Sequence, residues 1–196
     1  MTIQEYKRLL TQHADKINRL TRRAMPVIAG QTAVSHFKNN FQQSGFVNNG
    51  LHPWTPSKRI GTGSGAGSKD KTLLSGRNHL MSSIRYIPGD AQVTVTNKVV
   101  YASIHNEGGV IQSHPTVTKK MRKFAWAKFY EITGGAQAGV PVPADAQKWR
   151  AMALTKKTKL DIRIVMPKRQ FMGESKELND KIRAKFETKL SEILGL

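Results

Sequence analysis

The sequence predicts an α+β fold in which a small, mostly antiparallel sheet packs against long N-terminal and C-terminal helices, with a basic helical insertion. Three observations support this prediction. Apolar residues recur at helical spacing near both ends of the chain, strand-like alternation flanks a Pro-Gly-Asp turn, and a lysine-rich helical pattern lies between them. A chain of 196 residues is long enough to bury its own core, so we expect residues 1–196 to form a single domain.

The N-terminal segment is predicted to be a long amphipathic helix. Its apolar face recurs at alternating steps of three and four residues when one histidine is counted with it. The members of this face are Ile3, Tyr6, Leu10, His13, Ile17, Leu20 and Ala24. The pattern continues past Pro26, where we expect a kink. A long helix with one apolar stripe has to bury that stripe against a sheet or against another copy of itself.

Residues 44–71 are rich in glycine, serine, proline and lysine and are predicted to form a flexible loop. The alternative is a phosphate-binding loop, because the backbone N–H groups of glycine-rich turns can hold phosphates. A Walker loop requires lysine after its last glycine, whereas Gly67 is followed by Ser68 and no apolar strand precedes the stretch. The spacing therefore favours a linker.

The second half of the chain contains the remaining expected elements. The segments "SIRYI" and "AQVTVTN" alternate on either side of Pro88-Gly89-Asp90, which predicts an antiparallel hairpin. A helix is expected between Thr118 as its N-cap and Gly134, with Phe124 and Phe129 on its buried face. A short helix and the strand "LDIRIVMP" follow, and residues 174–194 are predicted to form a final amphipathic helix.

The chain is strongly basic, with 32 Lys and Arg against 13 Asp and Glu and a net charge of +19. Residues 112–170 hold thirteen of the basic residues and only three acidic ones. This excess is interpreted either as a solvated face or as a contact surface for DNA or an acidic assembly partner. Interleaved aromatic residues such as Trp126 and Trp149 would suit base stacking. The candidate contact residues are Lys119, Lys120, Arg122, Lys123, Lys128, Lys156 and Lys157.

The stretch "VVYASIHNEGG" resembles an active site by composition, because tyrosine, serine, histidine and glutamate lie close together. In a helix that ends at Gly108, His105 and Glu107 are two residues apart and point roughly 200° away from each other. Ser103 is separated from His105 in the same way. A zinc-binding HExxH motif needs a second histidine where this chain has glycine. Tyr101 and His105 share a face, which favours a structural histidine that packs and hydrogen-bonds.

The sequence gives little support for disulfide, metal, membrane or catalytic sites. The absence of cysteine excludes disulfides, zinc-thiolate sites and cysteine nucleophiles. No apolar run approaches the roughly 20 residues that cross a bilayer, and the polar N-terminus lacks a signal-peptide pattern, so we expect a soluble protein without a membrane partner. The remaining histidines form no spaced ligand set, and the acidic residues form no cooperating pair. We therefore predict no catalytic residue, no cofactor and no metal.

Four short motifs follow one another along the chain: "HPWTPSKR", "KTLLSGRNHLMSSIR", "VTVTNKVVYASIHNEGG" and "MPKRQFMGES". Their order resembles the Mu-like phage virion morphogenesis family, the group of tail completion proteins. The residues at matching positions include Trp54, Leu73, Leu74, Gly76, Tyr101, His105, Gly108, Pro167, Arg169 and Phe171. Residues 112–160, which are partly helical and basic, are an insertion relative to simpler members of that family.

The resemblance implies a non-enzymatic structural protein of a phage or prophage that completes the tail or joins tail to head at the neck. It further implies a homo-oligomer, such as a ring, in contact with other tail or neck proteins, whose positive charge would lie beside DNA or acidic partner rings. Assembly in the host cytoplasm and a place in the virion tail or neck follow from the same resemblance. A DNA-binding protein that uses residues 112–170 is the first alternative, and a hydrolase that uses His105 or Glu107 is the weakest.

Overall fold

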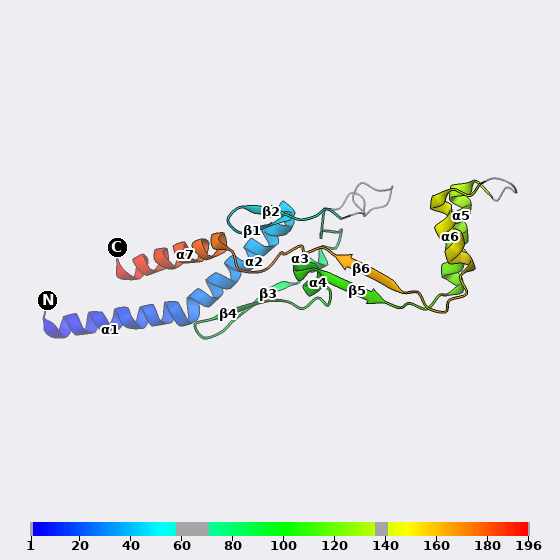
Figure 1. Ribbon diagram of the computed structural model, residues 1–196. Coiled ribbons are helices and arrows are strands. Elements are labelled where there is room, and N and C mark those ends of the chain that lie inside the picture. The colour runs from blue at the N-terminus through cyan, green and yellow to red at the C-terminus, as the bar shows by residue number, and fades with distance from the viewer. Residues whose placement is uncertain (1, 58–70, 136–140, 196) are drawn as a thin grey trace. The chain divides into compact units, whose positions relative to one another are not determined.

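The computed structural model describes residues 2–57, 71–135 and 141–195 and shows the predicted α+β fold (Figure 1). The strands pair in three separate two-stranded sheets, β1–β2, β3–β4 and β5–β6. In chain order the elements are α1 (Ile3–Arg19), the π-helical turn η1 (Leu20–Ala24), α2 (Met25–Gln43), β1 (Gly45–Val47), β2 (Leu51–Pro53), α3 (His79–Ser82), β3 (Ile84–Pro88), β4 (Val93–Asn97), α4 (Ala102–Glu107), β5 (Gly109–Ser113), α5 (Lys119–Thr133), α6 (Ala144–Leu154), β6 (Ile162–Met166) and α7 (Lys176–Leu194).

The chain divides into two compact units. The first unit comprises Met1–Gly109 and Met166–Leu196, and the second comprises Val110–Val165. The second unit encloses the expected insertion of residues 112–160 and contains the helices α5 and α6. Every helix in the described part of the chain is too short or too polar to cross a membrane.

The long N-terminal helix is confirmed. It begins at a capping box, in which the Glu5 N–H donates to Thr2 Oγ1 at 3.2 Å and the Thr2 N–H donates to Glu5 Oε2 at 2.7 Å. The helical path continues past Pro26 as predicted, because this proline stands in the first turn of α2, where the fixed φ suits a helix. The expected kink lies earlier. The ribbon changes direction between α1 and α2, at the π-helical turn η1 (Figure 1).

Helix α2 supplies one side of the core of the first unit. Its Phe41 is fully buried, and its ring lies 5.5 Å from that of Trp54 and 5.1 Å from that of Phe171 between centroids. Each large apolar side chain removed from water in this way stabilises the fold by about 1.5–3 kcal/mol. The other buried members of this cluster are Ala33, Phe37, Leu74, Leu80, Ile84, Ala102 and Leu178. The core therefore joins segments from both ends and the middle of the chain.

The predicted hairpin is confirmed as β3 and β4, which pair antiparallel over five facing residue pairs. It packs against α2 at Gly30, where an added Cβ would lie 2.3 Å from Cδ2 of Tyr86. Arg22 of η1 holds the hairpin turn, since its Nε donates to Asp90 Oδ1 at 2.8 Å. A glycine at this helix position thus permits the close approach of helix and hairpin.

Part of the segment predicted to be a flexible loop, residues 44–71, forms a β-hairpin. β1 and β2 pair antiparallel, and the side chains of Phe46 and Trp54 are buried. Ser44 ends α2 in the left-handed conformation, with φ 53°, and its carbonyl accepts the Trp54 N–H at 2.9 Å. Residues 45–53 therefore depart from the loop prediction because buried aromatic rings hold them. Residues 58–70, which contain the glycine-rich stretch, lie outside the described residues.

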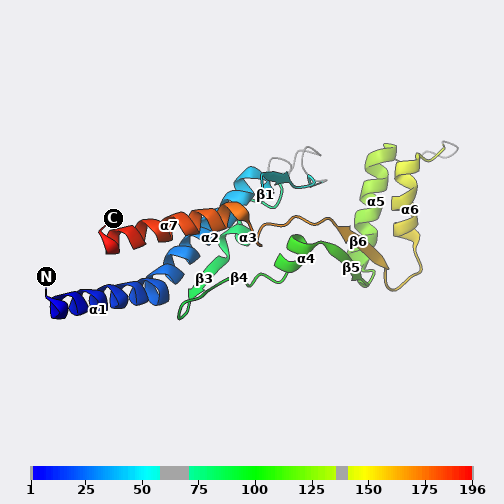
Figure 2. The same cartoon turned by 60° about the vertical axis from the view of Figure 1, so that its left-hand side comes forward.

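In the second unit, α5 and α6 lie side by side (Figure 2). The predicted N-cap of α5 is confirmed, because Thr118 Oγ1 accepts the Met121 N–H at 3.2 Å, and the helix ends at Gly134 with φ 63°. Phe129 is buried as predicted, but Phe124 is 54% exposed, so that part of the core prediction is wrong. In the described part of this unit, α6 is the element that packs against α5, and a single neighbouring helix covers one side of α5.

Candidate functional site

The short motifs meet along residues 166–175, the segment that leads from β6 to α7. The indole Nε1 of Trp54 donates to the carbonyl of Gln170 at 2.7 Å, and Phe171 is 1% exposed. The group of residues that holds this segment is called the motif cluster below. It consists of Trp54, His105, Asn106, Arg169 and Phe171.

Arg169 joins two distant segments through main-chain carbonyls. Its side chain is 7% exposed, and Nε donates to the Thr55 carbonyl at 2.8 Å while an Nη donates to the Pro56 carbonyl at 3.4 Å. Its own backbone N–H donates to the carbonyl of His105 at 2.8 Å. Burial lowers the pKa of Arg169, and the carbonyl acceptors compensate part of the cost of burying the charge. This arginine therefore acts as a structural connection.

Two asparagines that the sequence analysis does not identify complete the arrangement. Asn106 Oδ1 accepts the backbone N–H groups of Phe171 at 2.9 Å and Met172 at 3.0 Å. Asn40 donates from Nδ2 to the Phe171 carbonyl at 3.1 Å and accepts the Val47 N–H at 3.3 Å. The one available signal was the position of Asn106 inside the tyrosine–histidine motif. Asparagine suits this task because its amide both donates and accepts.

The helix predicted around His105 is confirmed as α4, with Gly108 as its C-cap. Tyr101 and His105 share a face, and their rings meet edge-on with centroids 5.9 Å apart. The hydrogen bond expected with this packing is not formed, because among the described residues the buried Nδ1 of His105 has no partner. Burial, with a smaller effect of the Arg169 charge, lowers the pKa of His105. The imidazole is therefore neutral at pH 7.

A hollow of about 200 Å³ adjoins the motif cluster and is lined in part by His79, Tyr101, His105 and Arg169. Hydroxyls of serine and threonine also line it, but none of its described lining residues is a carboxylate. A hydrolytic site requires a nucleophile hydrogen-bonded to its base. Within residues 2–57, 71–135 and 141–195, no hydroxyl bonds to the His105 ring, and no three side chains gather as a metal site. The geometry thus favours a packing role for His105 over a hydrolytic or metal-binding one.

The remaining motif positions differ in how strictly the structure requires them. Gly108 has φ 75°, and an added Cβ would lie 2.8 Å from the backbone nitrogen of Lys168, so only glycine fits. Leu74 is buried, whereas Leu73 and Pro167 are half-buried. A Cβ added at Gly76 would meet no described atom within 4 Å, and no steric reason for that glycine is evident.

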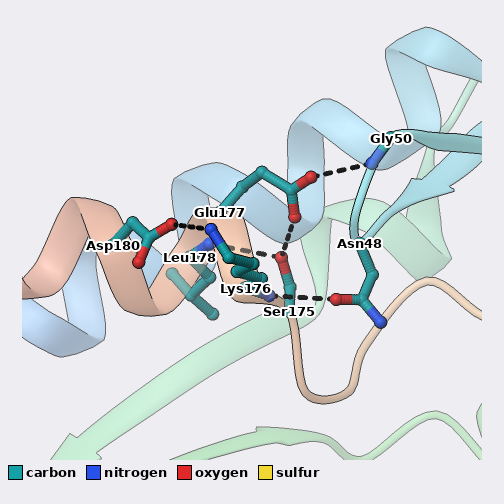
Figure 3. Close-up of polar contacts among 7 residues, drawn as sticks. All are labelled: Asn48, Gly50, Ser175, Lys176, Glu177, Leu178 and Asp180. Atoms are coloured by element: carbon teal, nitrogen blue, oxygen red, sulfur yellow. Dashed lines mark hydrogen bonds and ion pairs between the residues drawn. The ribbon is translucent and has the colours of Figure 1, made fainter.

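A second junction fixes the start of α7 against the β1–β2 turn (Figure 3). Glu177 Oε1 accepts the Gly50 N–H at 2.9 Å, and its Oε2 accepts the Ser175 hydroxyl at 3.2 Å. Asn48 Oδ1 accepts the N–H of Lys176 at 3.0 Å. Hydrogen bonds to the carboxylate, that from Gly50 first, lower the pKa of Glu177 to about 2. The carboxylate therefore remains ionised and bonded over nearly the whole pH range.

The predicted basic contact residues all lie in the second unit but divide into two groups. Arg122 donates to the carbonyls of Ala153 and Thr155 at the end of α6, and Lys128 pairs with Glu131 at 2.6 Å. These two side chains have structural partners. The other five are exposed: Lys119, Lys120, Lys123, Lys156 and Lys157.

The motif cluster holds main-chain segments in place. Residues 1–191 of the chain match the phage virion morphogenesis family. The protein therefore belongs to that family, and its role lies in the structure or assembly of phage particles. No curated protein and no solved structure is significantly similar to it.

Proposed function

We propose that this protein is a non-enzymatic component that completes the phage tail and joins it to the head at the neck, as a homo-oligomer. It assembles in the host cytoplasm and becomes part of the tail or neck. The family assignment and the packing role of the motif cluster support a structural function. Other tail or neck proteins are then its partners.

The observation that carries the proposal is the uncovered apolar face of α1. Its members repeat every seven residues in two series, the a and d positions of a coiled coil. This heptad face consists of Ile3, Tyr6, Leu10, His13 and Ile17 of α1. The series ends at Leu20 of η1, which is already buried within the chain. Helix α7 lies beside α1 (Figures 1 and 2), yet Ile3, Tyr6 and Leu10 remain 76%, 49% and 50% exposed. Such a face requires a further partner.

A second copy of the chain fits this face. In a parallel, in-register pair, the residues that flank the seam are those that a coiled coil places opposite each other at positions g and e. Leu9 would then face Ala14, and Lys16 would face Thr21. No like charges meet in this arrangement.

Substitution of the heptad face tests the oligomer. Leu10→Glu places a carboxylate in the seam and should weaken self-association by at least about tenfold, because burying an unpaired charge costs more than about 1.4 kcal/mol. Gln12→Glu adds the same charge on the opposite side of α1 and serves as the control. Light scattering on a sizing column measures the mass. A monomeric parent, or an unchanged mass for Leu10→Glu, would overturn the oligomer proposal.

Electron microscopy of particles made without this protein tests the place of action. The proposal predicts filled heads and tails that accumulate separately. Normal joined particles would rule out a role in joining, and heads that fail to fill with DNA would assign the protein to an earlier step.

DNA binding is the second candidate, and the five exposed lysines of the second unit are the observation that favours it. A free DNA-binding protein should bind duplex or single-stranded DNA tightly as a monomer, with an affinity that falls steeply as salt increases. Titration of labelled duplex and single-stranded oligonucleotides at several salt concentrations decides between the two functions. DNA binding that is insensitive to salt, or too weak to detect, would rule out the DNA-binding function and leave the structural role as the remaining candidate.

A further inference from the structure

An apolar hollow lies between α5 and α6 in the second unit. Its volume is about 500 Å³, and its walls include Met121, Phe124, Trp149 and Met152. The Phe124 ring is 54% exposed and meets Trp149 edge-on, with centroids 5.8 Å apart and ring planes at 80°. Ligand pockets in proteins typically measure about 300–1,000 Å³ and are mainly apolar. The hollow is therefore large enough to receive an apolar side chain from a partner.

The charges near the hollow are mostly of one sign. Lys120 lines it, and Lys119 and Lys123 are exposed on the same helix, without an ion pair in the described part of the chain. The unit contains eleven Lys and Arg but three acidic residues, and each acidic residue already lies beside a basic side chain. Those pairs are Lys128–Glu131 at 2.6 Å, Lys148–Asp145 at 3.9 Å and His114–Asp161 at 3.5 Å. A partner that carries carboxylates would complement this charge.

We propose that the α5–α6 hollow binds a peptide segment of a neighbouring virion protein, in which one large apolar side chain is flanked by aspartate or glutamate. The apolar side chain enters between Phe124 and the two methionines, and the flanking carboxylates meet Lys119, Lys120 and Lys123. Methionine side chains are flexible and polarisable, and they adapt to apolar groups of differing shape. This inference rests on the proposed role in particle assembly and specifies the chemistry of one partner.

The same hollow fits nucleic acid less well. Bases bind by stacking on open aromatic faces. Here Phe124 and Trp149 meet edge to face, and much of the remaining wall is formed by thioether and methyl groups of Met121, Met152 and Ala125. These groups favour an aliphatic or aromatic side chain. A peptide is therefore the occupant to which the geometry points, and DNA is a competing outcome of the test.

Methyl NMR of the full-length protein tests the inference directly. The probes are short synthetic peptides with a central leucine, phenylalanine or tryptophan between aspartates, the same peptides with lysine in place of aspartate, and a single-stranded oligonucleotide. We expect the aspartate peptides to shift the methyl signals of Met121 and Met152, and to leave that of Met25 in the first unit unchanged. The inference would be overturned if no aspartate peptide shifted the methyl signals of Met121 and Met152. It would also be overturned if the lysine peptides or the oligonucleotide shifted them equally.

A matched pair of variants locates the site. Phe124→Ser should weaken binding of the best aspartate peptide by about tenfold, the loss expected when a substantial part of a buried aromatic contact is removed. Tyr130→Ser changes a comparably exposed ring of α5 that does not line the hollow and should leave the affinity unchanged. Equal effects of both variants would contradict the assignment. Because oligomer mass and head joining are measured separately, failure here leaves the proposed function to its own tests.

Discussion

His36 of α2 is 4% exposed, and neither of its ring nitrogens has a hydrogen-bond partner among the described residues. Burial is the main cause that lowers the pKa of His36. The charge of Lys181 on α7 adds to this effect, while the Val47 backbone and Glu177 oppose it. The unfolded chain, with a histidine pKa near 6.5, therefore binds more protons than the folded chain at acidic pH. The contribution of His36 to the free energy of unfolding is therefore fully present above pH 6.5. It is lost as the pH falls toward the lowered pKa of the folded state.

The variant His36→Leu should consequently be less sensitive to acid than the parent. Its free energy of unfolding should decrease less between pH 7 and pH 5, and it should exceed that of the parent by about 1 kcal/mol near neutrality, because a buried unpaired polar group is removed. Some dependence on pH should remain, since burial also lowers the pKa of His105. Urea unfolding at several pH values measures this. A slope equal to that of the parent would show that His36 does not control acid sensitivity.

Asn106 allows a test of whether the motif cluster needs an oxygen acceptor at this position. Asn106→Ala leaves the backbone N–H groups of Phe171 and Met172 without their acceptor and should lower the free energy of unfolding by about 2 kcal/mol. Asn106→Asp retains an oxygen acceptor and should retain most of the stability. Thermal unfolding of both variants gives the comparison. Equal losses for aspartate and alanine would indicate that the amide acts by another route.

At the scale of helices and strands, α2 and the β3–β4 hairpin approach each other closely at Gly30. Gly30→Ala places a Cβ against the ring of Tyr86 and should destabilise the first unit by about 1–2 kcal/mol, despite the better helix propensity of alanine. Gly76→Ala is the control, because an added Cβ there meets no described atom within 4 Å. Denaturant unfolding compares the two. A stabilising effect of Gly30→Ala would mean that the hairpin readily moves away from α2.

Local sequence signals predicted elements well where the governing interactions are local. Thr118 and Gly134 mark the ends of α5 because capping depends on neighbouring residues, and the β3–β4 turn likewise follows from its own residues. The buried face of α5 depends on which elements cover it, so Phe124 was wrongly assigned to the core. The π-helical turn before Pro26 carries no sequence signature, and its kink was placed too late in the chain.

The same distinction applies to the residues of the motif cluster. Gly108 and Trp54 occur in motifs, and their fit is visible in main-chain geometry. The clamps made by Asn40 and Asn106 join residues more than sixty positions apart, and no spacing rule identifies such pairs. The β1–β2 hairpin escaped prediction for a related reason. Its glycine- and asparagine-rich composition is typical of loops, while its burial depends on the distant core.

At the scale of the whole molecule, each of the two units has an exposed feature that lies outside the core. The first unit presents the heptad face of α1, and the second presents exposed lysines around an apolar hollow. Neither feature is needed to bury the core that surrounds Phe41. We interpret both as contacts with other molecules, which agrees with membership of a family that assembles virions.

Joining of purified heads and tails in vitro tests this account most directly. Filled heads and tails from a phage that lacks the protein are mixed with the purified chain, and infectious particles are counted. The account predicts that the parent protein and Gln12→Glu restore joining, whereas Leu10→Glu, which disrupts the heptad face, does not. Full activity of Leu10→Glu, or no joining with the parent protein, would contradict the claim that this chain acts as an oligomeric connector between head and tail.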